Sequence, residues 1–171
     1  MEAEKRRSEL LNLLRRSSTP LTGTELATHF NVSRQVIVQD IAILRASGEQ
    51  IFASLQGYLI PSLLQERRQQ TVVACRHTRE EIEDELGIVV DLGGRVLDVI
   101  VDHPVYGELR GNLMVASRRD LSLFMESLNK TAAHPLLTLT DGVHLHTLEA
   151  PDKRVMDEIT AGLEKAGYLV K

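Results

Sequence analysis

The sequence has a single cysteine and lacks any long apolar segment. No apolar run approaches the roughly 18 residues that a membrane-spanning helix needs, and the charged start MEAEKRRSELL is unlike a secretory signal. Because Cys75 is alone, no internal disulfide can form, which fits a reducing compartment. With 43% hydrophobic residues over 171 positions, we expect a globular cytoplasmic protein with no membrane partner, in which Cys75 is a small core residue.

Positive charge is scarce as well, and it is unevenly distributed. The net charge is -4. Residues 1–62 carry seven Lys/Arg and six Asp/Glu, a net charge of +1, whereas residues 63–171 carry 13 and 18, a net charge of -5. A surface that binds phosphate groups is therefore expected within residues 1–62.

The pattern over residues 1–62 is typical of a helix-turn-helix with a wing. Leucines among charged residues predict a one-sided helix over 7–16. Thr24 is the predicted cap of a short second helix, and Ser33 that of a third helix, which Gly48 ends. Two short apolar runs, 51–53 and 58–60, predict a small hairpin after the helices. The segment is thus predicted to be a winged helix-turn-helix.

The third helix is predicted to read DNA. With Ile37, Ile41 and Leu44 turned inward, its outer face carries arginine and glutamine, which can bridge guanine O6/N7 and adenine N6/N7, and a valine that can touch a thymine methyl. A helix N-terminus also favours a nearby phosphate. The predicted DNA-binding residues are Thr24, Ser33, Arg34, Gln35, Val38, Gln39 and Arg45. The alternative is a three-helix module for protein contacts.

The rest of the chain is predicted to be a second domain. Residues 63–70 are polar with little periodicity and predict a linker. From residue 71 to 171, strand and helix patterns alternate in an order close to βαββαββαβ. Such an order predicts an α+β fold, an α/β sandwich in which helices cover one face of a mainly antiparallel sheet.

Two histidines stand out between Pro135 and Leu148. Alternating runs on either side of Asp141-Gly142 predict a hairpin with a type I′ turn. His144 and His146 then share one strand face with Cα atoms roughly 6.5 to 7 Å apart, near enough for two imidazoles to converge on a cation. Histidines on a solvated strand face would show the same spacing, so the spacing alone leaves both interpretations open.

Longer motifs carry a family resemblance. His77 with Glu85, the run GGRVLDVIVDHPVYGELRG (93–111) and the run HPLLTLTDGVHLHTLEAP (134–151) resemble the 3H domain, a family named for three histidines. SRQVIVQDIAILRASG (33–48) and the following hairpin resemble the winged helix-turn-helix of biotin-repressor-like transcription factors. Together, the two parts are similar to bacterial niacin-responsive repressors, which control niacin uptake or NAD synthesis genes.

The resemblance implies a metal and an effector. It implies that residues 71–171 bind a transition metal through His77, Glu85, His144 and His146, and that nicotinic acid acts as corepressor. Three imidazoles and one carboxylate suit Ni or Zn, and also Fe or Co, rather than Mg or Ca. His134 and Tyr106 are candidates for the ligand pocket. His103 and His134 each precede a proline, and both are expected to be structural or pocket-lining and not metal ligands. A homodimer on palindromic double-stranded operator DNA is expected, because one helix-turn-helix reads only a short half-site.

Two other functions use the same residues. The cation itself could be the signal of a metal-responsive regulator. A His/Glu metal site with an open position is also what a metal-dependent hydrolase uses. Glu83 and Asp84 neighbour Glu85, but such carboxylates more often form a solvated helix face. We therefore expect a regulator and not an enzyme.

Overall fold

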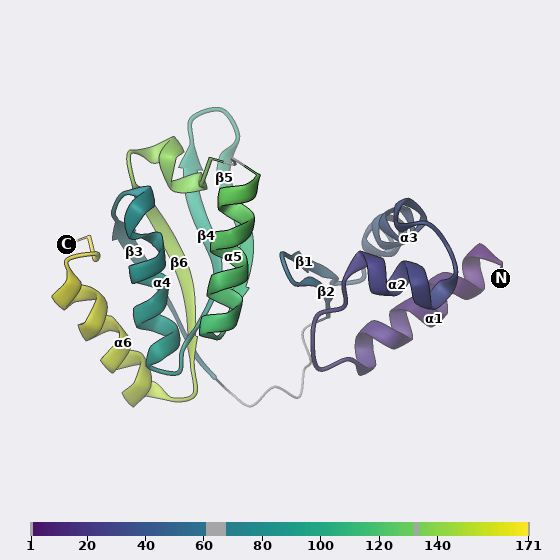
Figure 1. Cartoon of the computed structure of the whole chain (residues 1–171), viewed down its shortest axis with the longest axis horizontal. Helices are drawn as coiled ribbons and strands as arrows, with labels where there is room; N and C mark the ends of the chain where they lie inside the picture. The colour runs from purple at the N-terminus through teal and green to yellow at the C-terminus, as the bar shows by residue number, and fades with distance from the viewer. Residues whose placement is uncertain (1, 61–67, 132–133, 171) are drawn as a thin grey trace. The chain divides into compact units, whose positions relative to one another are not determined.

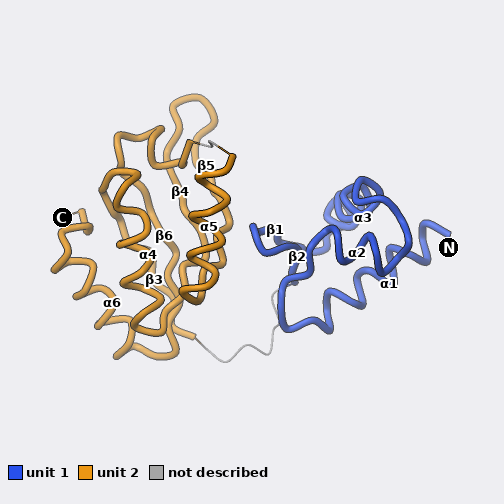
Figure 2. The backbone as a smooth tube through the Cα atoms, viewed as in Figure 1, with its two compact units in different colours: residues 1–65 blue, residues 66–171 orange. Residues whose placement is uncertain are grey.

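The chain folds into two compact units. The structure is a computed structural model that describes residues 2–60, 68–131 and 134–170. The first unit spans Met1–Gln65 and the second Glu66–Lys171 (Figure 2). The predicted linker at 63–70 lies mostly outside the described residues, and its last two residues belong to the first strand of the second unit, which begins at Gln69. No helix in the described ranges is long and apolar enough to cross a membrane.

The first unit has three helices and a two-stranded hairpin (Figure 1). Leucine, isoleucine and phenylalanine side chains from all three helices form its core, together with Ile51 before the hairpin. Leu21 pairs with Tyr58 through two backbone hydrogen bonds, which fasten the wing to the segment before the second helix. The elements are α1 (Ala3–Arg16), α2 (Gly23–Phe30), α3 (Arg34–Ala46), β1 (Phe52–Ser54) and β2 (Gly57–Leu59).

The helix starts follow local capping chemistry, with one correction. Ser33 caps α3 as predicted, since its side chain accepts the Val36 N–H. Thr24 is not a cap. Thr22 is the N-cap of α2, because Glu25 stands three residues later and completes a capping box with it. Thr24 therefore lies in the first turn of the helix.

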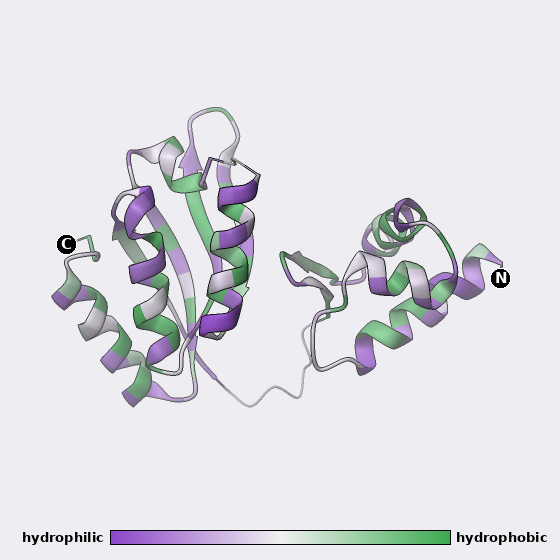
Figure 3. Ribbon diagram, viewed as in Figure 1, coloured by the Kyte–Doolittle hydropathy of each residue, from purple (hydrophilic) through white to green (hydrophobic). Residues whose placement is uncertain are grey.

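The second unit is a four-stranded sheet with three helices on one face (Figure 1). The strand order is β3-β6-β4-β5 and all neighbouring strands are antiparallel, which confirms the predicted α+β class. Apolar residues of the helices and strands form one core cluster, and Figure 3 shows apolar and polar residues alternating along the helices. The elements are β3 (Gln69–Arg76), a 3-10 turn η1 (Arg79–Glu81), α4 (Ile82–Asp91), β4 (Arg95–His103), β5 (Gly107–Val115), α5 (Arg118–Lys130), η2 (Leu136–Thr140), β6 (Val143–Ala150) and α6 (Lys153–Ala166).

The predicted hairpin around Asp141-Gly142 is wrong in its first half. Both residues have positive φ, 49° and 87°, as the turn requires. However, Leu136–Thr140 form the 3-10 helix η2 and not a strand. Pro135 starts this turn, and its carbonyl accepts the Thr138 N–H at 3.0 Å. The alternation of leucine and threonine is therefore an incidental match to a strand pattern.

The end of the chain also differs from the prediction. Instead of the last strand of the predicted order, the structure has one isolated bridge between Cys75 and Leu169. Arg76 N–H donates to the Tyr168 carbonyl at 2.8 Å and Val170 N–H to the Ala74 carbonyl at 2.9 Å. The order of the second unit is therefore βαββαβα, with the last segment held along the edge of β3.

Candidate metal centre and DNA-binding surface

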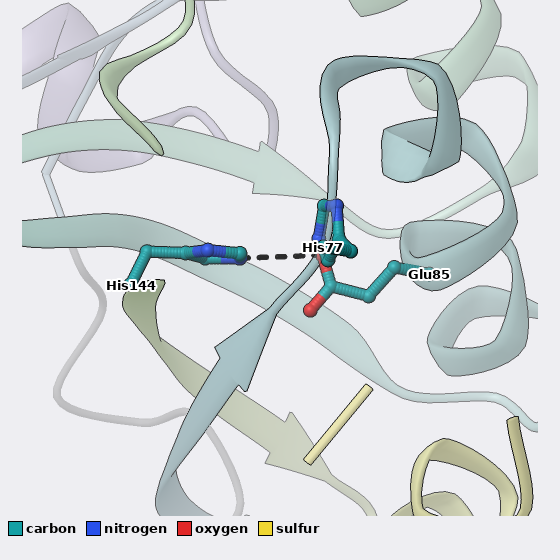
Figure 4. Close-up of side chains that lie close together, drawn as sticks. All are labelled: His77, Glu85 and His144. Carbon is teal, nitrogen blue, oxygen red and sulfur yellow. Dashed lines mark hydrogen bonds and ion pairs between the residues drawn. The ribbon is translucent and has the colours of Figure 1, made fainter. Parts of the chain in front are cut away.

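Three segments of the second unit bring four ionisable side chains together. His77 directly follows β3, Glu85 lies in the first turn of α4, and His144 and His146 point to the helix-covered face of β6. His77, Glu85 and His144 converge in Figure 4. In the register of β3 and β6, Cys75 stands opposite His144, so His77 leaves the strand beside the two β6 histidines. All four side chains are buried.

The geometry is centred on one carboxylate oxygen. Glu85 Oε2 lies 2.6 Å from His77 Nε2, 3.3 Å from His146 Nε2 and 3.5 Å from His144 Nε2. Donor atoms of His77, Glu85 and His144 all lie within 4.8 Å of one another. His146 falls outside that set of three, despite its short distance to Glu85. The structure therefore brings all four predicted residues together, with His146 the least tightly placed.

Backbone carbonyls fix the orientation of each imidazole in the cluster. His77 Nδ1 faces the Thr78 carbonyl at 2.7 Å, His144 Nδ1 the Gly142 carbonyl at 2.8 Å, and His146 Nδ1 the Asp98 carbonyl at 2.5 Å. A carbonyl only accepts, so each Nδ1 must carry a hydrogen. In neutral rings, all three Nε2 lone pairs then face the same carboxylate oxygen.

Such an arrangement of lone pairs requires a positive charge. A proton on one Nε2 satisfies one pair, but Glu85 Oε1 and His144 Nε2 still have no hydrogen-bond partner although they are buried. Unpaired buried polar atoms cost free energy. A transition-metal ion accepts all three lone pairs and the carboxylate at once, and His with a carbonyl-bound Nδ1–H is the common form of a metal-bound imidazole. The donor set therefore fits a transition metal.

The metal-free cluster has displaced pKa values. Burial raises the pKa of Glu85, but the three imidazoles outweigh it and hold the pKa well below its usual range. Burial lowers the pKa of His77, and the hydrogen bond and charge of Glu85 outweigh that effect and raise it. Burial and, after it, the charge of Glu85 raise the pKa of the Cys75 thiol. Metal therefore competes with a proton at His77 more than it would at a free imidazole, and the Cys75 thiol ionises less readily than usual.

A cavity of about 180 Å³ opens beside the cluster, between α4, α5, β4, β5 and η2. Glu85, His144 and His146 form its polar end, and among the residues that the structure describes no lysine or arginine lines it. The rest of the wall is apolar and consists of Ile82, Leu86, Val99, Gly111, Leu113, Phe124, Leu128, Pro135, Leu136 and Leu137. The residues of this wall are spaced along the chain as ordinary core positions are, so no sequence pattern marks them as a pocket.

Neither predicted pocket residue lines this cavity. Tyr106 is 74% exposed at the turn between β4 and β5, where it stacks on His103. His134 is exposed just before η2, and its neighbours Pro135 and Leu136 line the wall instead. His103 Nδ1 accepts the backbone N–H groups of Val105 and Tyr106 at 3.2 and 3.3 Å, which is a structural role in the turn.

The predicted DNA-binding residues divide into three groups. Arg34, Gln35 and Gln39 are exposed on the outer side of α3, and Val38 is half-buried between them. Arg45 is exposed, but its Nε donates to the Ile51 carbonyl at 2.7 Å, which ties it to the base of the wing. Thr24 is exposed in the first turn of α2, and Ser33 is exposed at the N-cap of α3.

One interaction that the sequence analysis missed positions α3. Asp40 faces inward, is 2% exposed, and accepts Arg6 Nε at 2.6 Å, with Arg7 at 3.7 Å. An acidic residue on the otherwise apolar inner face of a predicted helix indicates a buried ion pair, but the sequence alone does not identify its partner. The pair holds α1 against α3.

A winged helix-turn-helix with an exposed third helix, joined to a separate α+β unit, is the architecture of a DNA-binding transcription regulator. Residues 6–59 match the HTH domain and residues 70–171 the 3H domain. The chain is 48% identical over 168 residues to Transcription repressor NadR of Bacillus subtilis (97% of this chain, 93% of the relative). It is 45% identical over 168 residues to Probable transcription repressor NiaR of Thermotoga maritima (98% and 95%). The chain belongs to this family of 3H-domain transcription repressors.

Proposed function

We propose that this repressor uses nicotinic acid as its corepressor and holds a transition metal in the second unit. The metal ligands are His77, Glu85, His144 and His146. The observation that carries the proposal is the inward aim of three imidazole Nε2 atoms at one buried carboxylate, with Glu85 Oε1 and His144 Nε2 left unpaired. Nickel and zinc fit this donor set best, and iron or cobalt would also be accepted.

The cavity suggests how a pyridine carboxylate binds. An ionised carboxylate is costly to bury without a cation, and no cationic side chain in the described part of the chain lines the apolar wall. The carboxylate end therefore belongs at the His/Glu end of the cavity, where the bound metal supplies positive charge. The ring belongs against Phe124 and the leucines of the wall. Nicotinamide, which has no carboxylate, should bind more weakly in this arrangement.

The first unit supplies the DNA contacts. Arg34, Gln35, Val38 and Gln39 present the hydrogen-bonding groups and methyls that read base edges in a major groove. Thr24, Ser33 and Arg45 lie at helix ends or beside the wing and are suited to phosphate contacts. A homodimer on a palindromic operator would double this short recognition site.

Nicotinic acid would favour the arrangement of the dimer that matches two adjacent major grooves. To move a population from 1:99 to 99:1, it must bind the competent arrangement about 5.5 kcal/mol more tightly than the other. We place the dimer contact in the second unit, since the first must leave its outer surface to DNA. A sedimentation mass of one chain at micromolar concentration, with metal and nicotinic acid present, would contradict the dimer.

The test is a set of binding titrations on a DNA fragment that the protein selects from a random pool. Affinity is measured with no addition, with Ni²⁺ or Zn²⁺ alone, with nicotinic acid alone and with both. Tightening only with both supports the proposal. Full tightening with metal alone would instead identify a metal-responsive regulator, the function that the unpaired atoms also fit. His146→Ala should weaken metal binding and the nicotinic acid response together, and a wild-type response without metal would overturn the role of the metal.

A further inference from the structure

Strand β4 is irregular next to the His/Glu cluster. Its register with β6 shifts by one between the pairs Val96–Leu148 and Ile100–Leu145, so β4 has one residue more than β6 in this stretch. A β-bulge leaves backbone groups of the ladder unpaired and redirects side chains. Asp98 lies inside this bulge and is only 5% exposed.

Asp98 uses both its side chain and its backbone to hold β6. Its carboxylate Oδ1 accepts the Thr147 N–H at 2.9 Å, and its backbone carbonyl accepts the His146 Nδ1–H at 2.5 Å. The other oxygen, Oδ2, is held by Arg110 Nη1 at 2.6 Å. The Asp98 carboxylate therefore accepts a backbone N–H of β6. The Asp98 backbone carbonyl points at the His146 ring and orients it.

We propose that Asp98 is the positioning residue of the metal centre, and that it determines whether His146 joins His77, Glu85 and His144 as a fourth ligand. This inference rests on the proposed metal-binding function. His146 is the one histidine outside the set of three with mutually close donor atoms. The carbonyls that orient His77 and His144 lie one and two residues away in the chain, whereas Asp98 is 48 residues from His146.

The placement of His146 thus depends on tertiary structure in a way that the other two do not. If the bulge changes, the Nδ1–H of His146 loses its acceptor, and the ring can then turn or exchange its tautomer. The lone pair of Nε2 would no longer be presented to the cluster. The metal would keep three ligands and lose the fourth.

The same sheet provides a matched control. Glu149 of β6 is also 5% exposed and also pairs with arginines, Arg95 at 3.5 Å and Arg68 at 3.7 Å. It has no hydrogen bond or ion pair with a member of the cluster among the described residues. Glu149→Gln therefore removes a buried carboxylate of the sheet without touching the support of a histidine.

The experiment combines two measurements on the full chain. In metal-free protein, ¹⁵N NMR of the imidazoles reports which nitrogen of His146 carries the hydrogen, and Asp98→Asn should reduce Nδ1 protonation. In Ni²⁺ titrations, Asp98→Asn should weaken binding about 10- to 100-fold, as loss of an outer support does in metal sites. In the His146→Ala background, Asp98→Asn should have no further effect, because it acts through that ring. Glu149→Gln should match wild type in both measurements.

The outcomes that overturn the inference differ from those that overturn the proposed metal function. Unchanged Ni²⁺ affinity in Asp98→Asn, or losses that add to those of His146→Ala, would show that Asp98 supports only the sheet. Should the wild type bind neither Ni²⁺ nor Zn²⁺, the proposed metal function fails, and the NMR comparison still tests the positioning of His146. Arg110→Ala, which removes the partner of Asp98 Oδ2 and also that of Glu108, should shift both measurements in the same direction by less. If Asp98→Asn does not fold, an unchanged Arg110→Ala overturns the inference.

Discussion

Replacing Glu85 with glutamine separates the charge of the cluster from its shape. The carboxylate lies among three imidazoles, with Oε2 2.6 Å from His77 Nε2. In metal-free protein, the amide of Glu85→Gln can donate a hydrogen to one bare Nε2, so a hydrogen bond replaces the buried ion pair. Replacing a buried ion pair with a neutral pair of similar volume is often close to neutral for stability. We therefore expect the metal-free variant to fold.

The effect appears when metal is added. Metal at 100 times its Kd stabilises the folded state by about 2.7 kcal/mol. For a domain the size of the second unit, Glu66–Lys171, 1 kcal/mol shifts Tm by about 4–8 °C, so the wild-type transition should rise by about 10–20 °C. Glu85→Gln should lose most of this rise at the same metal concentration, since a neutral amide replaces the one anionic ligand.

Calorimetry of the full chain with Ni²⁺, with Zn²⁺ and with a chelator measures this shift. Glu83→Gln is the matched control, because it removes the same charge from the exposed side of the same helix. It should behave as wild type. A wild-type transition that does not move between chelator and metal would refute the assignment of these ligands, and so would a shift of equal size in Glu85→Gln.

Three further predictions follow from other parts of the structure. Arg34→Ala should cost about 1–3 kcal/mol of operator affinity and relax preference at one base position, whereas Arg154→Ala on α6 should not; equal site preference in selection experiments would contradict the base contact. Gly111→Ala would put a methyl carbon 3.3 Å from Leu136 Cδ1 in the cavity wall, so nicotinic acid should bind about tenfold more weakly with metal affinity unchanged. Loss of both nicotinic acid affinity and metal affinity would place the ligand elsewhere. The pKa of His77 is raised from its ordinary value of 6.5, so the contribution of this histidine to metal-free stability is complete below that value and is lost as pH rises through the raised pKa. Metal affinity should increase over the same pH range. Flat pH profiles in metal titration and thermal unfolding would contradict this.

Periodicity and capping residues were enough to predict most elements, because these signals are local. Ile37, Ile41 and Leu44 are buried on α3, as their spacing indicates. The two histidines of β6 share a face because side chains alternate along any strand. The failures came where two local patterns coincide. The leucines of η2 alternate with threonines as in a strand, and Thr24 stands only two residues from the threonine that forms the capping box.

The position of Glu85 shows what a residue count leaves out. Eight residues separate it from His77, a span of roughly 11–12 Å if all were helical. In the structure, η1 and the start of α4 turn the chain back over the end of β3, and the two side chains meet at 2.6 Å. The contact depends on the packing of α4 against the sheet, and no spacing rule contains that information.

The chemistry of the cluster is determined by irregular backbone as much as by its four side chains. A carbonyl oxygen has two lone pairs, so it can accept a ring N–H in addition to a backbone N–H. The Thr78 carbonyl also accepts the Glu81 N–H, and the Gly142 carbonyl also accepts the His77 N–H. The three carbonyls that orient the histidines lie where regularity ends: Thr78 between β3 and η1, Gly142 in a left-handed turn, and Asp98 in a bulge. With the opposite tautomers, the same side chains would donate Nε2–H groups to Glu85 and form a hydrogen-bonded core without room for a cation. A substitution that moves any one of these three carbonyls away from its histidine should therefore reduce metal affinity, even when all four side chains of the cluster are retained.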